Sequence, residues 1–148
     1  MKSCFLSLLF VLSAFADDRS AIGMTDEQAR AKYGVPVSAV KGNAPSEKAL
    51  LFERNGIIIV VEMLHGHVGR VSYARQDKGL FNEAQAETLL HNNGDGWQQL
   101  ESANAGIENW RNGSLLALHD VKRGTLIIMT KEFMREYKEL GVDALKGL

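Results

Sequence analysis

Arg54-Asn55-Gly56 and Arg111-Asn112-Gly113 are two copies of one tripeptide, and each copy lies between two apolar runs. Asn-Gly is the strongest short signal for a two-residue β-hairpin turn, because a type I′ turn needs positive φ at both central positions. The sequence therefore predicts two hairpins: strands 49–53 and 57–64 around the first copy, and strands 107–110 and 114–121 around the second.

Helix-start signals recur at the same 57-residue offset. Thr25 and Gln28 form a capping box, and Asn82 and Gln85 form another. The first helix is expected to run to about Tyr33 and to stop at 34–36, and the second to about residue 91, ending in 92–96. Three matching landmarks in so short a chain indicate a duplicated unit.

The fold class predicted from these signals is α+β, with two tandem repeats of an N-terminal helix followed by antiparallel strands, plus a C-terminal helix. Further strands are expected at 68–74, 97–102 and 125–129. The predicted organisation is a signal peptide at 1–16 and a single α+β domain at 17–148, which contains repeat one at about 22–75, repeat two at about 79–130 and the terminal helix at about 131–145.

The run Ile57-Ile58-Ile59-Val60-Val61 is apolar throughout rather than alternating. Such a strand is usually covered on both faces. The alternative is that one face stays open to a protein partner.

The N-terminus is typical of a targeting segment. Lys2 precedes an apolar run at 5–14, and Ala14-Phe15-Ala16 is a small-x-small cleavage site. The run is too short for a membrane span of about 20 residues. We expect cleavage after Ala16 and a periplasmic or secreted protein without a membrane span.

Composition excludes several classes of site. The only cysteine, Cys4, lies inside the predicted signal, so the mature chain has no disulfide, Cys-based metal site or thiol nucleophile. The net charge is −1 and no basic block occurs, which argues against nucleic acid as a partner. No phosphate loop or dinucleotide fingerprint is present, so no cofactor is predicted.

Gly23-Met24-Thr25, Glu27, Gly34 and Pro36 together match a Gly-Met-Thr-x-Glu…Gly-x-Pro signature. This signature resembles the small α/β module of bacterial outer-membrane assembly lipoproteins. Two such modules in tandem resemble the β-lactamase-inhibitor-protein architecture. Those families act by binding other proteins, so the resemblance implies a binding module rather than an enzyme.

His65-Gly66-His67 is the most suggestive pair for chemistry. Two histidines at i and i+2 on a strand share one face and can chelate a metal. Gly66 indicates a turn instead, and no third ligand is close in sequence. A solvated hairpin tip is the competing interpretation, and no metal site is predicted.

His119-Asp120 with Ser114 invites a hydrolase interpretation. Adjacent strand residues face opposite sides, so Asp120 cannot orient His119 as in a catalytic triad. We therefore predict no catalytic residue. The segment 92–96 looks like a calcium loop but lacks the glutamate at its twelfth position, which favours a helix stop.

The aromatic side chains are interpreted either as core or as partner-binding anchors. The predicted function is an exported non-enzymatic protein-binding module of the envelope-assembly or hydrolase-inhibitor type, whose partner is another exported or envelope protein. The alternative is a small secreted metal-binding protein or enzyme using His65, His67, His119 and Asp120. The partner-binding candidates are Tyr73, Trp97, Trp110, His65 and His67.

Overall fold

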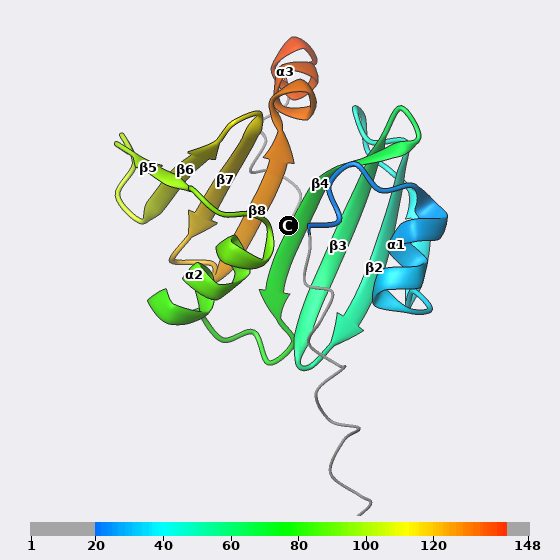
Figure 1. Ribbon diagram of the computed structural model, residues 1–148, viewed down its shortest axis with the longest axis horizontal. Coiled ribbons are helices and arrows are strands. Elements are labelled where there is room, and N and C mark those ends of the chain that lie inside the picture. The colour runs from blue at the N-terminus through cyan, green and yellow to red at the C-terminus, as the bar shows by residue number, and fades with distance from the viewer. Residues whose placement is uncertain (1–19, 142–148) are drawn as a thin grey trace, which may run out of the picture.

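One antiparallel sheet of eight strands carries three helices in the part of this chain that the computed structural model describes (Figure 1). The structure describes residues 20–141. The predicted signal peptide at 1–16 and the last residues of the predicted terminal helix lie outside this range. The elements are α1 (Asp26–Tyr33), β1 (Ser38–Lys41), β2 (Lys48–Arg54), β3 (Ile57–Leu64), β4 (His67–Arg75), α2 (Glu83–Asn92), β5 (Gln98–Leu100), β6 (Ile107–Asn112), β7 (Leu115–Asp120), β8 (Thr125–Thr130) and α3 (Lys131–Glu139).

The strand order is β1-β2-β3-β4-β8-β7-β6-β5. The first half of the chain, with α1 and β1 to β4, therefore meets the second half, with α2 and β5 to β8, at the β4–β8 pair. Their register places Tyr73 opposite Leu126 and Val71 opposite Ile128. Within each half, consecutive strands pair with one another antiparallel. The predicted α+β class is therefore confirmed, with an open sheet as its architecture.

The two Arg-Asn-Gly turns differ in register by one residue. Arg54 pairs with Ile57, and the loop residues Asn55 and Gly56 have φ of 52° and 76°, as the type I′ interpretation requires. In the second hairpin Asn112 itself pairs with Leu115, so the loop is Gly113-Ser114. The prediction that Asn112-Gly113 forms the loop is wrong by one position.

Both predicted capping boxes are present. The Thr25 and Asn82 side chains accept hydrogen bonds from the backbone of Gln28 and Gln85, whose side chains reach back to the cap residues. The two capped helices, α1 and α2, lie on the same face of the sheet, α1 over the strands of the first half and α2 over those of the second (Figure 1).

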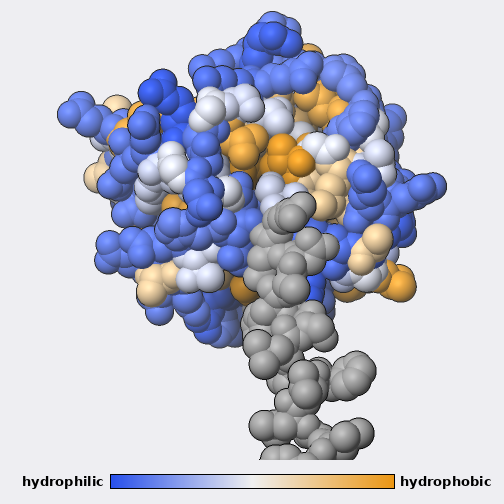
Figure 2. Space-filling view, in the orientation of Figure 1, coloured by the Kyte–Doolittle hydropathy of each residue, from blue (hydrophilic) through white to orange (hydrophobic). Residues whose placement is uncertain are grey.

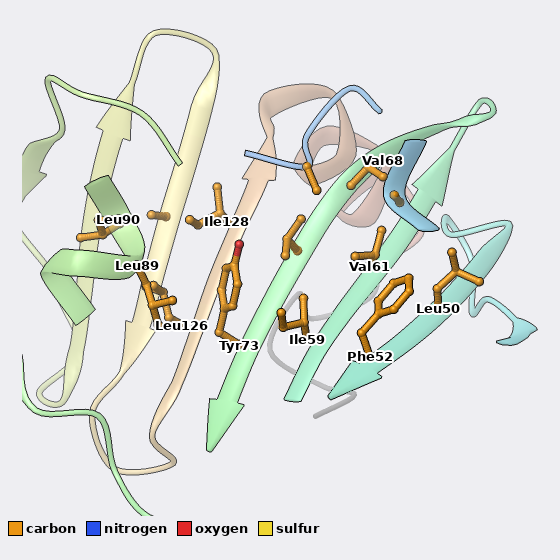
Figure 3. Packing of buried hydrophobic residues seen from close by; sticks show 14 of the residues in the cluster. Leu50, Phe52, Ile59, Val61, Val68, Tyr73, Leu89, Leu90, Leu126 and Ile128 are labelled. Carbon is orange, nitrogen blue, oxygen red and sulfur yellow. The ribbon is translucent and has the colours of Figure 1, made fainter. Parts of the chain in front are cut away.

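The main core lies between these helices and the sheet. Leu50, Phe52, Ile59, Val61 and Tyr73 from the first half point into it together with Leu126 and Ile128 of β8 and Leu89 and Leu90 of α2 (Figure 3). Hydrophobic residues are visible in the middle of this face, with mostly hydrophilic surface around them (Figure 2). Residues 20–25 lead into α1 and are joined to β4 by hydrogen bonds between Gly23, Met24 and Val68.

Helix α3 begins where β8 ends and packs on the opposite face. Its Phe133 and Tyr137 form a second core cluster with Leu64, Ile127 and Met129. Thr130 caps the helix by accepting a hydrogen bond from the Phe133 backbone. The end of β8, where α3 begins, and the His65-Gly66 turn between β3 and β4 lie at the same ends of the strands. We call this side of the sheet the α3 end.

Strand β1 was not expected from the sequence. All of its residues are exposed, and it pairs with β2 at the edge of the sheet. An edge strand without a buried face carries no hydrophobic alternation, so the pattern that reveals other strands is missing. The expected strand at 97–102 is also shorter, as β5.

The apolar strand β3 lies inside the sheet, between β2 and β4. Ile59 and Val61 are buried in the main core, whereas Ile58 and Val60 are half-buried on the face that α3 covers only at one end. Neither of the two sequence interpretations describes this strand fully. No helix within residues 20–141 is long and apolar enough to cross a bilayer.

Candidate functional site

A groove of about 770 Å³ lies between α2 and the end of the sheet opposite α3. The first half of the chain contributes the Asn55-Gly56 turn and the end of β4, and the second half contributes one side of α2. Ile57, Phe81 and Leu89 supply its apolar surface. Its volume falls within the range of about 300–1,000 Å³ that is typical of ligand pockets.

The two charged groups of the groove neutralise each other. Arg75 donates two hydrogen bonds to the Asp77 carboxylate, at 2.9 and 2.5 Å. These bonds, with a further one from the Gly79 backbone, hold the pKa of Asp77 far below its usual range. The same pair raises the pKa of Arg75. The groove therefore offers no unpaired charge from this pair.

The remaining polar surface of the groove is uncharged. It consists of amides and one hydroxyl, from Asn55, Gln76, Asn82, Gln85, Thr88 and Asn92. Gln76 donates to Glu53, and Thr88 donates to the Ala84 carbonyl. Neutral donors and acceptors around an apolar floor suit a ligand that is itself neutral and forms hydrogen bonds.

A second polar arrangement lies at the α3 end. His65 Nε2 is 2.9 Å from Glu136 Oε1, and this contact raises the pKa of His65. Glu47 accepts hydrogen bonds from the backbone of His65 and Gly66, at 3.0 and 3.2 Å. One ligand atom each of His65, Glu132 and Glu136 lies within 4.8 Å of the other two.

Beneath this exposed cluster, a buried ion pair joins β3 to β4. Arg70 Nη1 lies 3.1 Å from Glu62 Oε2 and donates to the Tyr137 hydroxyl at 3.0 Å. Arg70 is 2% exposed, and among residues 20–141 its Nε and Nη2 atoms have no hydrogen-bond partner. Burial raises the pKa of Glu62, and the neighbouring Arg70 opposes that shift.

The residues of the alternative enzyme or metal interpretation are not brought together. His65 and His67 lie at the α3 end, whereas Asp120 pairs with Thr125 at the opposite end. His119 is buried, with Nδ1 3.0 Å from Glu108 Oε2. Asp120 instead accepts hydrogen bonds from the backbone that follows it.

The candidate aromatic anchors pack against the main core. Tyr73 is 5% exposed and its hydroxyl contacts the Asn93 side chain at the end of α2. Trp97 is half-buried and donates to the Leu90 carbonyl, and half-buried Trp110 stacks on His119. Tyr73 is therefore part of the main core. His65 and His67 are the two candidates that are exposed.

Sequence reasoning missed the groove and the acidic partners of His65. Glu132 and Glu136 are one turn apart on α3, so their shared face was readable from the sequence. The turn at His65-Gly66 was also expected, but its position next to Glu132 and Glu136 was not readable, because 67 residues of sequence separate Glu132 from His65.

The sequence matches no protein-family model and no curated protein. Solved structures with a similar fold include the following two. An extracellular protein containing an SCP domain from Bacillus anthracis matches with a TM-score of 0.58 at 11% identity, over 90% of this chain and 53% of its own. A cysteine-rich secretory protein from Staphylococcus aureus matches with a TM-score of 0.51 at 10% identity, over 80% of this chain and 47% of its own. This chain thus spans about half the length of each.

These matches correct the resemblance inferred from the Gly-Met-Thr signature. The fold is similar to that of part of each of these two bacterial proteins, and the resemblance to outer-membrane assembly lipoproteins and β-lactamase-inhibitor proteins was wrong. The reason lies in the signature itself. Thr25 is the N-cap of α1 and Gly34 its C-cap, so the motif describes where a helix starts and stops.

Proposed function

We propose that this chain is an exported, non-enzymatic protein-binding domain whose groove beside α2 holds an extended, uncharged segment of a polypeptide partner. The main evidence for this proposal is the composition of that groove. Its apolar floor is surrounded by amide side chains, and the arginine and the aspartate that line it are paired with each other. A peptide backbone offers alternating donors and acceptors to such amides, and its side chains enter apolar surface.

The aromatic content of the groove favours a peptide over a sugar. Sugar sites commonly present the face of an exposed aromatic ring. The aromatic residue lining this groove is Phe81, which is 4% exposed and belongs to the main core.

Export is supported by two independent observations. The sequence at 1–16 has the charge, apolar run and small-x-small site of a signal peptide. The solved structures that share the fold are described as a secretory and an extracellular protein.

The separation of His65 from His119 and Asp120 supports a binding rather than a catalytic role.

We further propose that the two halves arose by duplication. Each half is a helix followed by four antiparallel strands, and each helix starts with a capping box 57 residues from the other. The groove would then be a feature of the junction between copies, because both halves line it.

Selection of peptides from a displayed random library tests the proposed groove. We expect the selected peptides to be uncharged at their centre and to lose affinity for an Ala84→Lys variant, because Ala84 is an exposed lining residue of α2. His91→Lys is the matched control, since His91 is also exposed on α2 but does not line the groove.

Equal binding to wild type and Ala84→Lys would overturn the proposal, because the peptides would then bind elsewhere. Failure to select any peptide would also overturn it. Circular dichroism of both lysine variants verifies that α2 remains folded.

A further inference from the structure

We infer that His65, Glu132 and Glu136 form a binding site for a divalent transition-metal ion of the Zn²⁺ type, which would join the β3–β4 turn to α3. The site lies at the α3 end, away from the groove, and does not depend on the proposed function. The sequence alone offered two histidines and no third ligand. The fold supplies the missing ligands from a helix 67 and 71 residues further along the chain.

The donor set suits such an ion. One ligand atom from each residue lies within 4.8 Å of the other two, a spacing that a small inward movement of side chains converts to coordination. Imidazole nitrogen and carboxylate oxygen are both zinc ligands, and catalytic zinc sites combine three protein ligands with a position left to water. His67 is outside the group, and its Nδ1 lies 3.1 Å from the His65 carbonyl.

Both elements are fixed independently of a metal. The His65 backbone has a positive φ of 51° and is held by the Glu47 carboxylate, which also lies 3.7 Å from His65 Nδ1. Glu47 lies on the Nδ1 side of the ring but beyond hydrogen-bond distance, so a small approach of its carboxylate would be needed to accept the Nδ1–H and fix the tautomer that leaves Nε2 for a metal. On the other side, Phe133 anchors α3 with no exposed surface.

Protons compete for the same atoms. Without a metal, Nε2 of His65 lies 2.9 Å from Glu136 Oε1, and the two form an ion pair when the imidazole is protonated. The groups that face His65 are Glu47, Glu132 and Glu136, and Arg135 is a competing cation that lies 3.9 Å from Glu132. Since a metal needs the neutral imidazole, binding must release a proton and weaken as the pH falls.

Calorimetric titration of ZnCl₂ into untagged, chelator-treated protein tests the site at pH 7.5 and 5.5. We expect one ion per chain at pH 7.5, weaker binding at pH 5.5 and proton release that scales with the ionisation enthalpy of the buffer. The thermal midpoint should rise when Zn²⁺ is added, because the ion ties a turn of the first half to the last helix.

The variants separate a built site from surface histidine. His65→Asn and Glu136→Gln should each abolish the one-site isotherm; asparagine is chosen because it tolerates positive φ. Glu47→Gln should weaken affinity by about 10- to 100-fold, as loss of an outer partner does. His91→Gln is the matched control, since His91 is exposed and lies 3.5 Å from a single carboxylate, that of Asp95.

Three results would overturn the inference. One is the absence of saturable binding at up to about 1 mM Zn²⁺, far weaker than the structural sites of proteins. Another is a His65→Asn variant that binds as wild type does while remaining folded by circular dichroism. The third is an equal loss in His91→Gln, which would indicate adventitious binding to exposed histidines.

Discussion

Gly69 leaves the space that the ring of Phe133 occupies: a Cβ built on Gly69 would lie 2.6 Å from Phe133 Cδ2. It would also lie 3.1 Å from Leu64 Cβ. Real atoms do not approach so closely, so α3 sits at its observed height over β4 because residue 69 has no side chain. The position of Glu132 and Glu136 beside His65 depends on this contact.

Gly69→Ala should therefore lower the free energy of unfolding by about 1–3 kcal/mol, the usual cost of overpacking a core. Chemical denaturation measures the change. The double variant with Phe133→Leu should recover part of the loss, because the smaller side chain relieves the clash. If the double variant instead loses the sum of the free energies that the two single variants lose, the proposed contact is contradicted.

The buried pair of Glu62 and Arg70 predicts a pH-dependent defect. Arg70→Met removes the charge that faces the Glu62 carboxylate, and loss of one partner of a buried pair costs about 3–5 kcal/mol. Burial already raises the pKa of Glu62 in the folded state, and loss of Arg70 raises it further. A folded-state pKa above the unfolded value means that protonation favours the fold, so the defect should shrink as the pH falls below the raised pKa.

Denaturation of Arg70→Met between pH 7 and 5 measures this recovery relative to wild type. The control is Glu62→Gln/Arg70→Met, which has no buried carboxylate and should show no recovery attributable to this site. A defect in Arg70→Met that stays constant across the range would contradict the predicted titration of Glu62.

The register difference between the two hairpins predicts unequal effects of glycine. Asn55 has a positive φ, which glycine adopts readily, so Asn55→Gly should change stability by less than about 0.5 kcal/mol. Asn112 is a strand residue whose Nδ2 donates to the Asp95 carbonyl at 2.7 Å. Asn112→Gly should cost about 1–2 kcal/mol, from lost strand preference and a lost hydrogen bond. Thermal denaturation of the two variants side by side decides between this register and two identical turns.

The contact between His65 and Glu136 is predicted to stabilise the fold at acid pH. Glu136 raises the folded-state pKa of His65, so protonation of His65 favours the fold. The contribution is complete below the ordinary pKa of about 6.5 and is lost as the pH rises through the raised value. The difference in unfolding midpoint between wild type and His65→Asn, measured in EDTA to remove metal, should therefore shrink from pH 5.5 to 8.5. A difference that grows with pH would contradict this assignment.

Tyr73→Phe separates the core and partner roles of that side chain. Its hydroxyl contacts Asn93 in the buried space between β4 and α2, so its removal should cost about 1–2 kcal/mol. Affinity for groove-binding peptides should stay unchanged when measured well below the unfolding temperature. Loss of affinity with unchanged stability would instead make Tyr73 a partner anchor.

Local signals in the sequence determined the local structure. The capping residues Thr25 and Asn82 start helices where predicted, because an N-cap satisfies backbone N–H groups within its own first turn. The Asn55-Gly56 turn forms as predicted for the same reason, since its φ angles are set by its own two residues. Strand β1 was invisible, because its pairing with β2 leaves no buried face to read.

The same locality explains the misleading resemblance. A signature built from Gly23, Thr25 and Gly34 reports a helix start and stop, and such caps recur in unrelated folds. The one-residue shift at Gly113 likewise lay outside what the tripeptide specifies, because pairing of Asn112 with Leu115 depends on the register of the whole second hairpin.

The sequence by itself thus determined the helices, most strands, the first turn and the α+β class, since each depends on neighbours a few residues away. Only the tertiary structure decided which distant groups meet. The β4–β8 pairing joins the halves, brings α2 beside the first turn to make the groove, and carries α3 back over Gly69 to face His65. Those contacts arise from sheet order and close packing, which no short stretch of sequence encodes.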